Sequence, residues 1–135
     1  MATSLDLARE LVAAAARDLV ILTKGVPDPE FPIEALGFHC HQAVEKCIKA
    51  VLAIQQVEFR KIQDIRTLVD LARDAGVEAP SGDQLEVLTP FAVEFRYRAL
   101  PQGKSPVERD RMPVLARAVY EWAETRILAG ESGAE

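Results

Sequence analysis

The sequence has no long hydrophobic run. The longest one extends from Leu11 to Ala16, whereas a helix needs about 20 consecutive apolar residues to cross a bilayer. Residues 1–10 contain acidic side chains and lack the basic segment, apolar centre and cleavage site of a secretory signal. We therefore predict that no segment spans a membrane, and we expect a cytoplasmic protein.

Cysteine is also scarce. Cys40 and Cys47 are the only two, and on one helix their Cα atoms would be about 10 Å apart, which is too far for a disulfide. We expect both to be reduced core residues. His39 and His41 stand beside them, but residues two apart on a helix point about 200° apart and cannot close on one zinc ion. The pattern predicts no metal site and no cofactor.

Basic residues are outnumbered by acidic ones. The formal net charge is −5, which excludes the broad basic surface of a general nucleic-acid binder and leaves only a local basic patch open. The sequence also lacks a glycine-rich phosphate loop, a paired-cysteine motif and a nucleophile elbow. No residue is predicted to be catalytic.

What the sequence does contain is helical periodicity. Of its 135 residues, 49% are hydrophobic and 27% are charged, a composition typical of a globular domain. Apolar residues recur every three or four positions, and no useful stretch alternates with period two. We predict an all-α, up-and-down bundle of about five helices, forming a single domain over residues 1–135 with 130–135 as a frayed tail.

Caps and glycines set most of the expected helix ends. Thr3, Asp64 and Ser81 are predicted N-caps, and Gly25 and Gly76 are predicted to follow the last turns of their helices. The expected helices lie at about residues 3–24, 34–57, 64–76, 81–95 and 105–129.

The start of the fifth helix has the strongest signal in the sequence. Ser105, Pro106 and Glu108 combine a cap, a proline at the first helical position and a reciprocal glutamate. Pro90 and Pro113 are expected to bend the fourth and fifth helices without ending them, because the apolar pattern continues past each proline.

The second helix, from about Glu34 to Val57, has two polar edges beside its apolar stripe. One edge carries His39, Gln42, Lys46 and Lys49, and the opposite flank carries His41 and Glu45. We interpret both histidines as hydrogen-bonding surface groups. The alternative is an acid–base role, since an imidazole titrates near neutral pH.

The fourth helix ends in the sequence Phe95-Arg96-Tyr97-Arg98. Two guanidinium groups around an aromatic ring suit a nucleotide, because arginine binds phosphate with two parallel hydrogen bonds and a tyrosine face stacks on a base. The alternative is structural, since cations at a helix C-terminus complement the helix dipole without any ligand.

Residues 38–50 read Phe-His-Cys-His-Gln-Ala-Val-Glu-Lys-Cys-Ile-Lys-Ala. This segment resembles the signature helix of the HEPN family, Phe-His-x-x-Gln-Ala-x-Glu-Lys-x-x-Lys-Ala. Downstream, Gln63-Asp64-Ile65 stands where the family often has His-Asp-Leu, and Phe95-Arg96-Tyr97 stands where it often has Arg-Tyr-Pro. Order and spacing agree, so the resemblance covers nearly the whole chain.

The resemblance implies a compact helical bundle that binds a nucleotide or RNA and is frequently a homodimer. Many members of the family are partners of a minimal nucleotidyltransferase in a toxin–antitoxin pair, and some are metal-independent endoribonucleases. Together with the cluster at residues 95–98, it predicts a nucleotide- or RNA-binding site made of His39, Gln42, Lys46, Arg96, Tyr97 and Arg98.

The ribonuclease members of the family use an arginine followed four to six residues later by a histidine. Here the arginines before His39 are Arg9 and Arg17, more than twenty residues upstream. We therefore predict a non-catalytic binding module. One alternative is an endoribonuclease with a degenerate site, in which His39 or His41 is the base and Arg96 stabilises the developing charge. Another is a protein-interaction scaffold subunit.

Overall fold

The computed structural model describes residues 3–59, 61–62, 64–96, 98–101 and 104–133. Its elements are α1 (Ser4–Gly25), α2 (Ile33–Ile54), α3 (Ile65–Asp74), α4 (Gly82–Leu85), the short 3₁₀ helix η1 (Glu86–Leu88), α5 (Thr89–Val93), the short 3₁₀ helix η2 (Glu94–Arg96) and α6 (Arg111–Gly133). Every regular element in these ranges is helical, which confirms the predicted all-α class.

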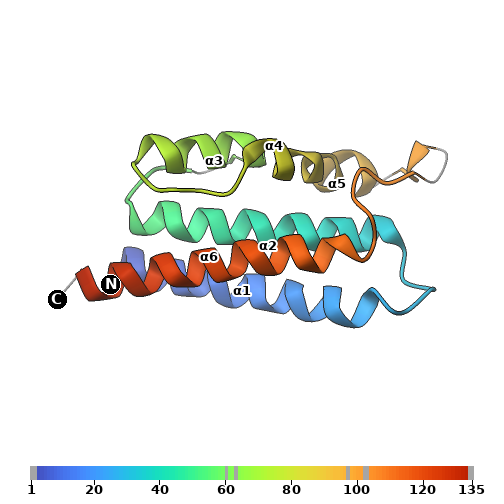
Figure 1. Ribbon diagram of the computed structural model, residues 1–135, viewed down its shortest axis with the longest axis horizontal. Helices are drawn as coiled ribbons and strands as arrows, with labels where there is room; N and C mark the ends of the chain where they lie inside the picture. Colours follow the sequence, from blue (N-terminus) through green and yellow to red (C-terminus); the bar gives the residue numbers. More distant parts are fainter. Residues whose placement is uncertain (1–2, 60, 63, 97, 102–103, 134–135) are drawn as a thin grey trace.

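Helix α2 occupies the centre of the bundle (Figure 1). Helices α1 and α6 pack against it and against each other, whereas α3, η1 and α5 pack along its other side. The first turn of α1 and the last turn of α6 lie at the same end of the molecule. Within the described ranges, none of the helices is long and apolar enough to cross a membrane.

The caps predicted for the first and third helices have mixed outcomes. Asp64 stands at the N-cap position of α3, but its side chain accepts from the Thr67 hydroxyl at 2.6 Å and makes no capping bond to the helix backbone. Thr3 caps α1, since its hydroxyl accepts from the Asp6 amide at 3.1 Å while the Asp6 carboxylate accepts from the Thr3 amide at 3.0 Å. Gly76 follows α3 with φ +85°, a left-handed conformation that glycine adopts without strain. Gly25 was expected just after the first helix but lies inside its last turn, and Val26 is the C-cap.

The fourth predicted helix is not continuous. Ser81 does cap its first turn, accepting from the Gln84 amide at 3.4 Å. The chain then passes from α4 through η1 to α5 and η2. Pro90 lies in the first turn of α5, and because its ring removes a backbone N–H donor, the predicted bend takes the form of a change in helix type.

The prediction that the fifth helix starts at Ser105 is wrong, because α6 begins at Arg111. Ser105 caps no helix, and its hydroxyl instead exchanges hydrogen bonds with the backbone of Val107. The Arg109 side chain holds this segment against the end of α1, where the last carbonyls of a helix have no intrahelical donor. Its guanidinium donates to the backbone carbonyls of Gly25 at 3.0 Å, Val26 at 2.8 Å and Asp28.

The two ends of α6 differ from expectation for simple reasons. Pro113 is the third residue of the helix, where its missing N–H would have no intrahelical partner in any case, so no kink is required. The helix continues to Gly133, through part of the predicted tail. At Gly130 the helix approaches α2 closely, and an added Cβ would lie 2.9 Å from the Ile54 side chain.

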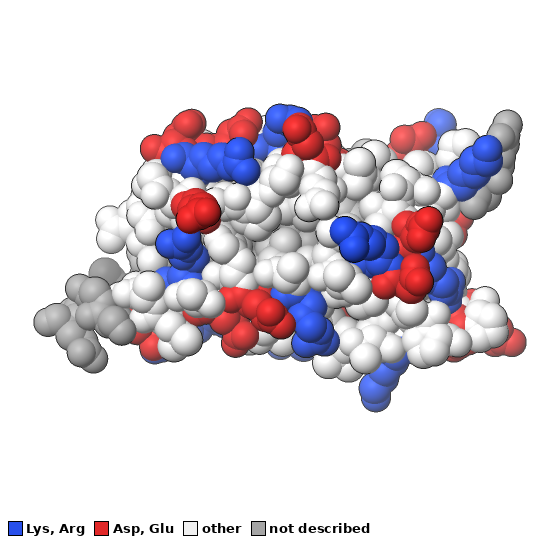
Figure 2. Space-filling model, viewed as in Figure 1, with Lys and Arg blue, Asp and Glu red and all other residues white. Residues whose placement is uncertain are grey.

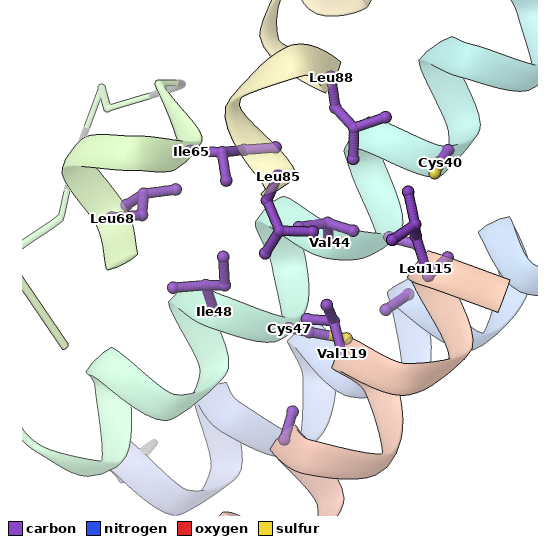
Figure 3. Packing of buried hydrophobic residues seen from close by; sticks show 14 of the residues in the cluster. Cys40, Val44, Cys47, Ile48, Ile65, Leu68, Leu85, Leu88, Leu115 and Val119 are labelled. Carbon is purple, nitrogen blue, oxygen red and sulfur yellow. The ribbon is translucent and has the colours of Figure 1, made fainter. Parts of the chain in front are cut away.

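The hydrophobic core fills the space around α2 (Figure 3). Cys40, Val44, Cys47 and Ile48 of α2 meet Ile65 and Leu68 of α3, Leu85 of α4, Leu88 of η1, and Leu115 and Val119 of α6. Gly37 brings α5 onto α2, since a Cβ at this position would lie 2.2 Å from the ring of the fully buried Phe91. This contact also brings the next residue, Ala92, close to α2.

Candidate functional site

A pocket of about 460 Å³ lies on a polar edge of α2. Leu11 of α1 forms one wall and Ala92 of α5 the other. The α2 side chains that line it are those of Phe38, Gln42, Glu45, Lys46 and Lys49. Their spacing of four, three, one and three residues keeps them on one face of the helix. Two of these five α2 residues, Gln42 and Lys46, are predicted binding residues, and the other three were not predicted to bind a ligand.

A buried carboxylate from α1 lies beside this pocket. The side chain of Asp18 is only 8% exposed, and its two oxygens accept from Lys46 Nζ at 2.7 Å and pair with His39 Nδ1 at 2.9 Å. Lys46 and His39 are seven residues apart, so both face α1. Asp18 is thus the group that orients two of the predicted site residues, and it links α1 to α2.

A second carboxylate, Glu45, arranges the rest of the pocket. It accepts from Lys49 Nζ at 2.8 Å and from the Gln42 amide at 3.3 Å. Glu45 was expected on the flank opposite Gln42 and Lys49, and this expectation is wrong. Glu45 lies three residues from Gln42 and four from Lys49, the two separations at which helical side chains meet.

The structure also corrects the interpretation of one histidine. His41 is fully buried, not on the surface, and its Nδ1 lies 3.7 Å from a carboxylate oxygen of Glu45. A ring without solvent access cannot act as a base on an external substrate. His39 is different, since its side chain is 25% exposed while Nδ1 is paired with Asp18. Its ring also packs edge-on against Phe38, with 5.3 Å between ring centroids.

The predicted arginine–tyrosine cluster is only partly described. Arg98 is exposed. The backbone of Arg96 ends η2, which packs against α2, and Arg96 lies four residues after the pocket residue Ala92. The Arg96 side chain and the whole of Tyr97 lie outside the described residues, as does Gln63.

The two cysteines lie on the core side of α2, away from this chemistry. Both are free and buried, which confirms the prediction that they are core residues. Burial raises the pKa of Cys40 to about 12. Burial, aided by the charges of Glu124 and Asp18, raises that of Cys47 to about 12 as well. A thiol with such a pKa is not a nucleophile at neutral pH.

The charges around the pocket balance each other. Lys46 and Lys49 face the carboxylates of Asp18 and Glu45, so the site has no large positive potential. Each ammonium nevertheless has three N–H donors, and the one hydrogen bond described for each lysine leaves donors for a ligand. The Lys46 side chain is 28% exposed and that of Lys49 is 17% exposed, so both are accessible from the pocket.

Two further features limit the chemistry of the molecule. In the face viewed in Figure 2, basic and acidic side chains alternate around a largely uncharged centre, so this face carries no continuous basic stripe. Among the described residues, no three histidine, cysteine, aspartate or glutamate side chains gather so that they could hold a metal ion.

Sequence reasoning missed Asp18 and Phe38 and gave Lys49 no role. A signal for Asp18 was available, because it lies three residues after Ala15 and four before Leu22, on the apolar stripe of α1. A charged residue on a core-facing stripe requires a partner. The identity of its partners could not be predicted, since it depends on how α1 packs on α2.

The fold and the pocket define a small all-α bundle with a polar site on its central helix. A family model, that of the HEPN domain, matches residues 30–126, and the chain belongs to this family. Neither a search of curated proteins nor a search of solved structures found a match. Within the family signature at residues 38–50, Gln42, Lys46 and Lys49 line the pocket, while Ala43, Val44 and Cys47 are buried in the core.

Proposed function

We propose that this HEPN protein is a non-catalytic binding module and that its pocket holds the phosphate and base of a nucleotide or an RNA segment. The observation that supports this most directly is the convergence of Gln42, Lys46 and Lys49 with the Phe38 ring between α1 and α5. Ammonium groups donate to phosphate oxygens, an amide hydrogen-bonds a base or sugar, and an aromatic face stacks on a base.

The remaining predicted residues would extend the site. Arg96 ends η2, which packs against α2, four residues after Ala92, and Tyr97 follows it in the sequence, so we expect a ligand longer than one nucleotide to continue toward Arg96. Arg98 would add a charge at the exposed end, and His39 would contribute its ring beside Phe38. Because the lysine charges are balanced by carboxylates, we expect a weak affinity that falls as salt is added.

A titration with ATP and with a short single-stranded RNA tests this proposal. Replacing Lys49 by Gln removes one charged donor, worth about 1.5 kcal/mol, so affinity should fall roughly tenfold. Arg96→Ala should weaken RNA binding more than ATP binding. The matched control is Lys61→Gln, an exposed lysine outside the pocket, which should leave both affinities unchanged. Absence of binding by the unaltered protein, or equal effects of the two lysine changes, would contradict the proposal.

One observation favours a second function, an endoribonuclease with a degenerate site. The Nδ1–Asp18 pair of His39 is the arrangement that orients a general base, because a neutral ring that donates through Nδ1 keeps an acceptor at Nε2. Incubation with a fluorogenic RNA would reveal such activity. Cleavage that is lost in His39→Gln would support this function over binding alone, and absence of cleavage would exclude it.

Membership of the HEPN family also supports a proposal about the proteins that this chain binds. We propose that the protein is a homodimer in the cytoplasm and that a nucleotidyltransferase-like protein is its partner in a toxin–antitoxin pair. Two free thiols fit a reducing compartment. Co-expression with a small nucleotidyltransferase encoded beside it should yield one complex on size exclusion. Two separate peaks would contradict the partnership.

A further inference from the structure

The outer side of the seam between α1 and α6 forms one continuous strip. Two shallow pockets follow the seam and share Tyr120. One end of the strip is lined by Ala16, Leu19, Val20, Thr23, Lys24 and Arg117. The other end is lined by Arg9, Val12, Ala13, Glu124, Ile127, Leu128 and Glu131. The strip faces away from the phosphate pocket, to which α1 contributes Leu11 instead.

The strip exposes large apolar side chains at both ends. Val20 is 53% exposed and Leu128 is 62% exposed, and Ala13 lies exposed between their levels on α1. The aromatic Tyr120 lies at the middle, half-buried. An aromatic centre with aliphatic neighbours is the composition of a protein–protein contact.

The two ends of the strip differ in charge. Lys24 and Arg117 give one end two positive charges. The other end has Glu124 and Glu131 against Arg9, one positive and two negative charges, and Arg9 is already paired with Glu131 at 2.7 Å. A strip that is basic at one end and acidic at the other is complementary to an antiparallel copy of itself.

We propose that a second copy of this chain docks on the α1–α6 strip, antiparallel, about a twofold axis near Tyr120. Arg117 precedes Tyr120 by three residues and Glu124 follows it by four. An axis near Tyr120 therefore places Arg117 of one copy opposite Glu124 of the other, and the same contact is made twice. The inference specifies the interface of the homodimer proposed above and is independent of the proposed nucleotide site.

The size of the strip predicts a dimer of moderate strength. Residues 9–24 of α1 extend over about 23 Å, and two adjacent helices present a width of roughly 20 Å. The resulting face is on the order of 500 Å², less than the ~800 Å² per partner of standard interfaces. Dissociation should accordingly occur in the micromolar range, which sedimentation velocity covers directly.

Charge reversal at each end tests the antiparallel geometry. Variant A carries Arg117→Glu, and variant B carries Glu124→Lys. Each alone sets like charges against each other, so its dissociation constant should rise at least tenfold. An equimolar mixture of A and B restores opposite charges at both contacts, so it should form a heterodimer with close to the original affinity. Reversals at exposed sites elsewhere, Lys61→Glu and Asp74→Lys, are the controls.

The possible results test the homodimer and its interface separately. A monomeric unaltered protein at 100 μM would overturn the homodimer itself. A dimer that survives in both A and B, or a mixture of A and B that stays monomeric, would overturn this interface while leaving dimerisation intact. Circular dichroism verifies that the variants fold. Nucleotide affinity should be unchanged in A and B, because the strip and the pocket lie on different sides of α1, so the two proposals fail separately.

Discussion

Removing the Asp18 carboxylate should destabilise the fold measurably. In Asp18→Ala, Lys46 and His39 each lose a hydrogen bond to a buried anion. Hydrogen bonds to charged groups contribute about 1.5–3 kcal/mol each, and breaking a buried pair costs about 3–5 kcal/mol. Because the two partners are one quarter exposed, they regain some hydration, and we expect a net loss of about 2 kcal/mol. The melting temperature should fall by about 7 °C.

Urea unfolding followed by circular dichroism at pH 7 measures this loss. With an m-value of about 1.5 kcal/mol/M, the midpoint should shift by about 1.3 M while m stays constant. Asp70→Ala, which removes an exposed aspartate of α3, should change the free energy of unfolding by less than about 0.5 kcal/mol. If the two variants proved equally stable, the Asp18 carboxylate would have no structural role.

The isosteric change Asp18→Asn should strengthen ligand binding, although it destabilises the fold. It removes a negative charge from beside Lys46, at roughly 6 Å from a phosphate bound there. At an effective dielectric constant of about 40, that repulsion is about 1.4 kcal/mol, so ATP affinity should rise roughly tenfold although stability falls. Calorimetric titration of Asp18→Asn that gives unchanged or weaker affinity would refute the assignment of Lys46 to the phosphate.

Three other changes probe the fold. Gly37→Ala forces a Cβ into the Phe91 ring, so thermal unfolding should show a net loss of about 2 kcal/mol despite better helix propensity, and a milder loss would mean that α5 can move away. Since burial raises the pKa of the Cys40 and Cys47 thiols to about 12, a disulfide reagent at pH 8 should label neither until urea unfolds the chain, and rapid labelling of native protein would contradict their burial. Arg109→Lys loses the fork that reaches the carbonyls at the end of α1 and should cost about 1–2 kcal/mol, whereas an unchanged urea midpoint would show that the contact is dispensable.

Much of the fold could be predicted because its determinants are local. The start of α1 follows from the reciprocal bonds of Thr3 and Asp6, and the end of α3 follows from the left-handed Gly76. The start of α6 could not be predicted in this way. Ser105 and Pro106 have favourable local chemistry for a helix start, but Arg109 binds carbonyls more than eighty residues earlier in the sequence, and a local pattern contains no information about that contact.

The all-α class, the family and the residue types of the site follow from the sequence alone, because periodicity, caps and a signature on one helix are properties of neighbouring residues. How those residues are used depends on the packing of the helices. This packing buried His41, and it brought Asp18 from α1 to Lys46 and His39. A polar side chain on a helix edge acquires its environment from the helices packed beside it, and that packing is a property of the whole chain.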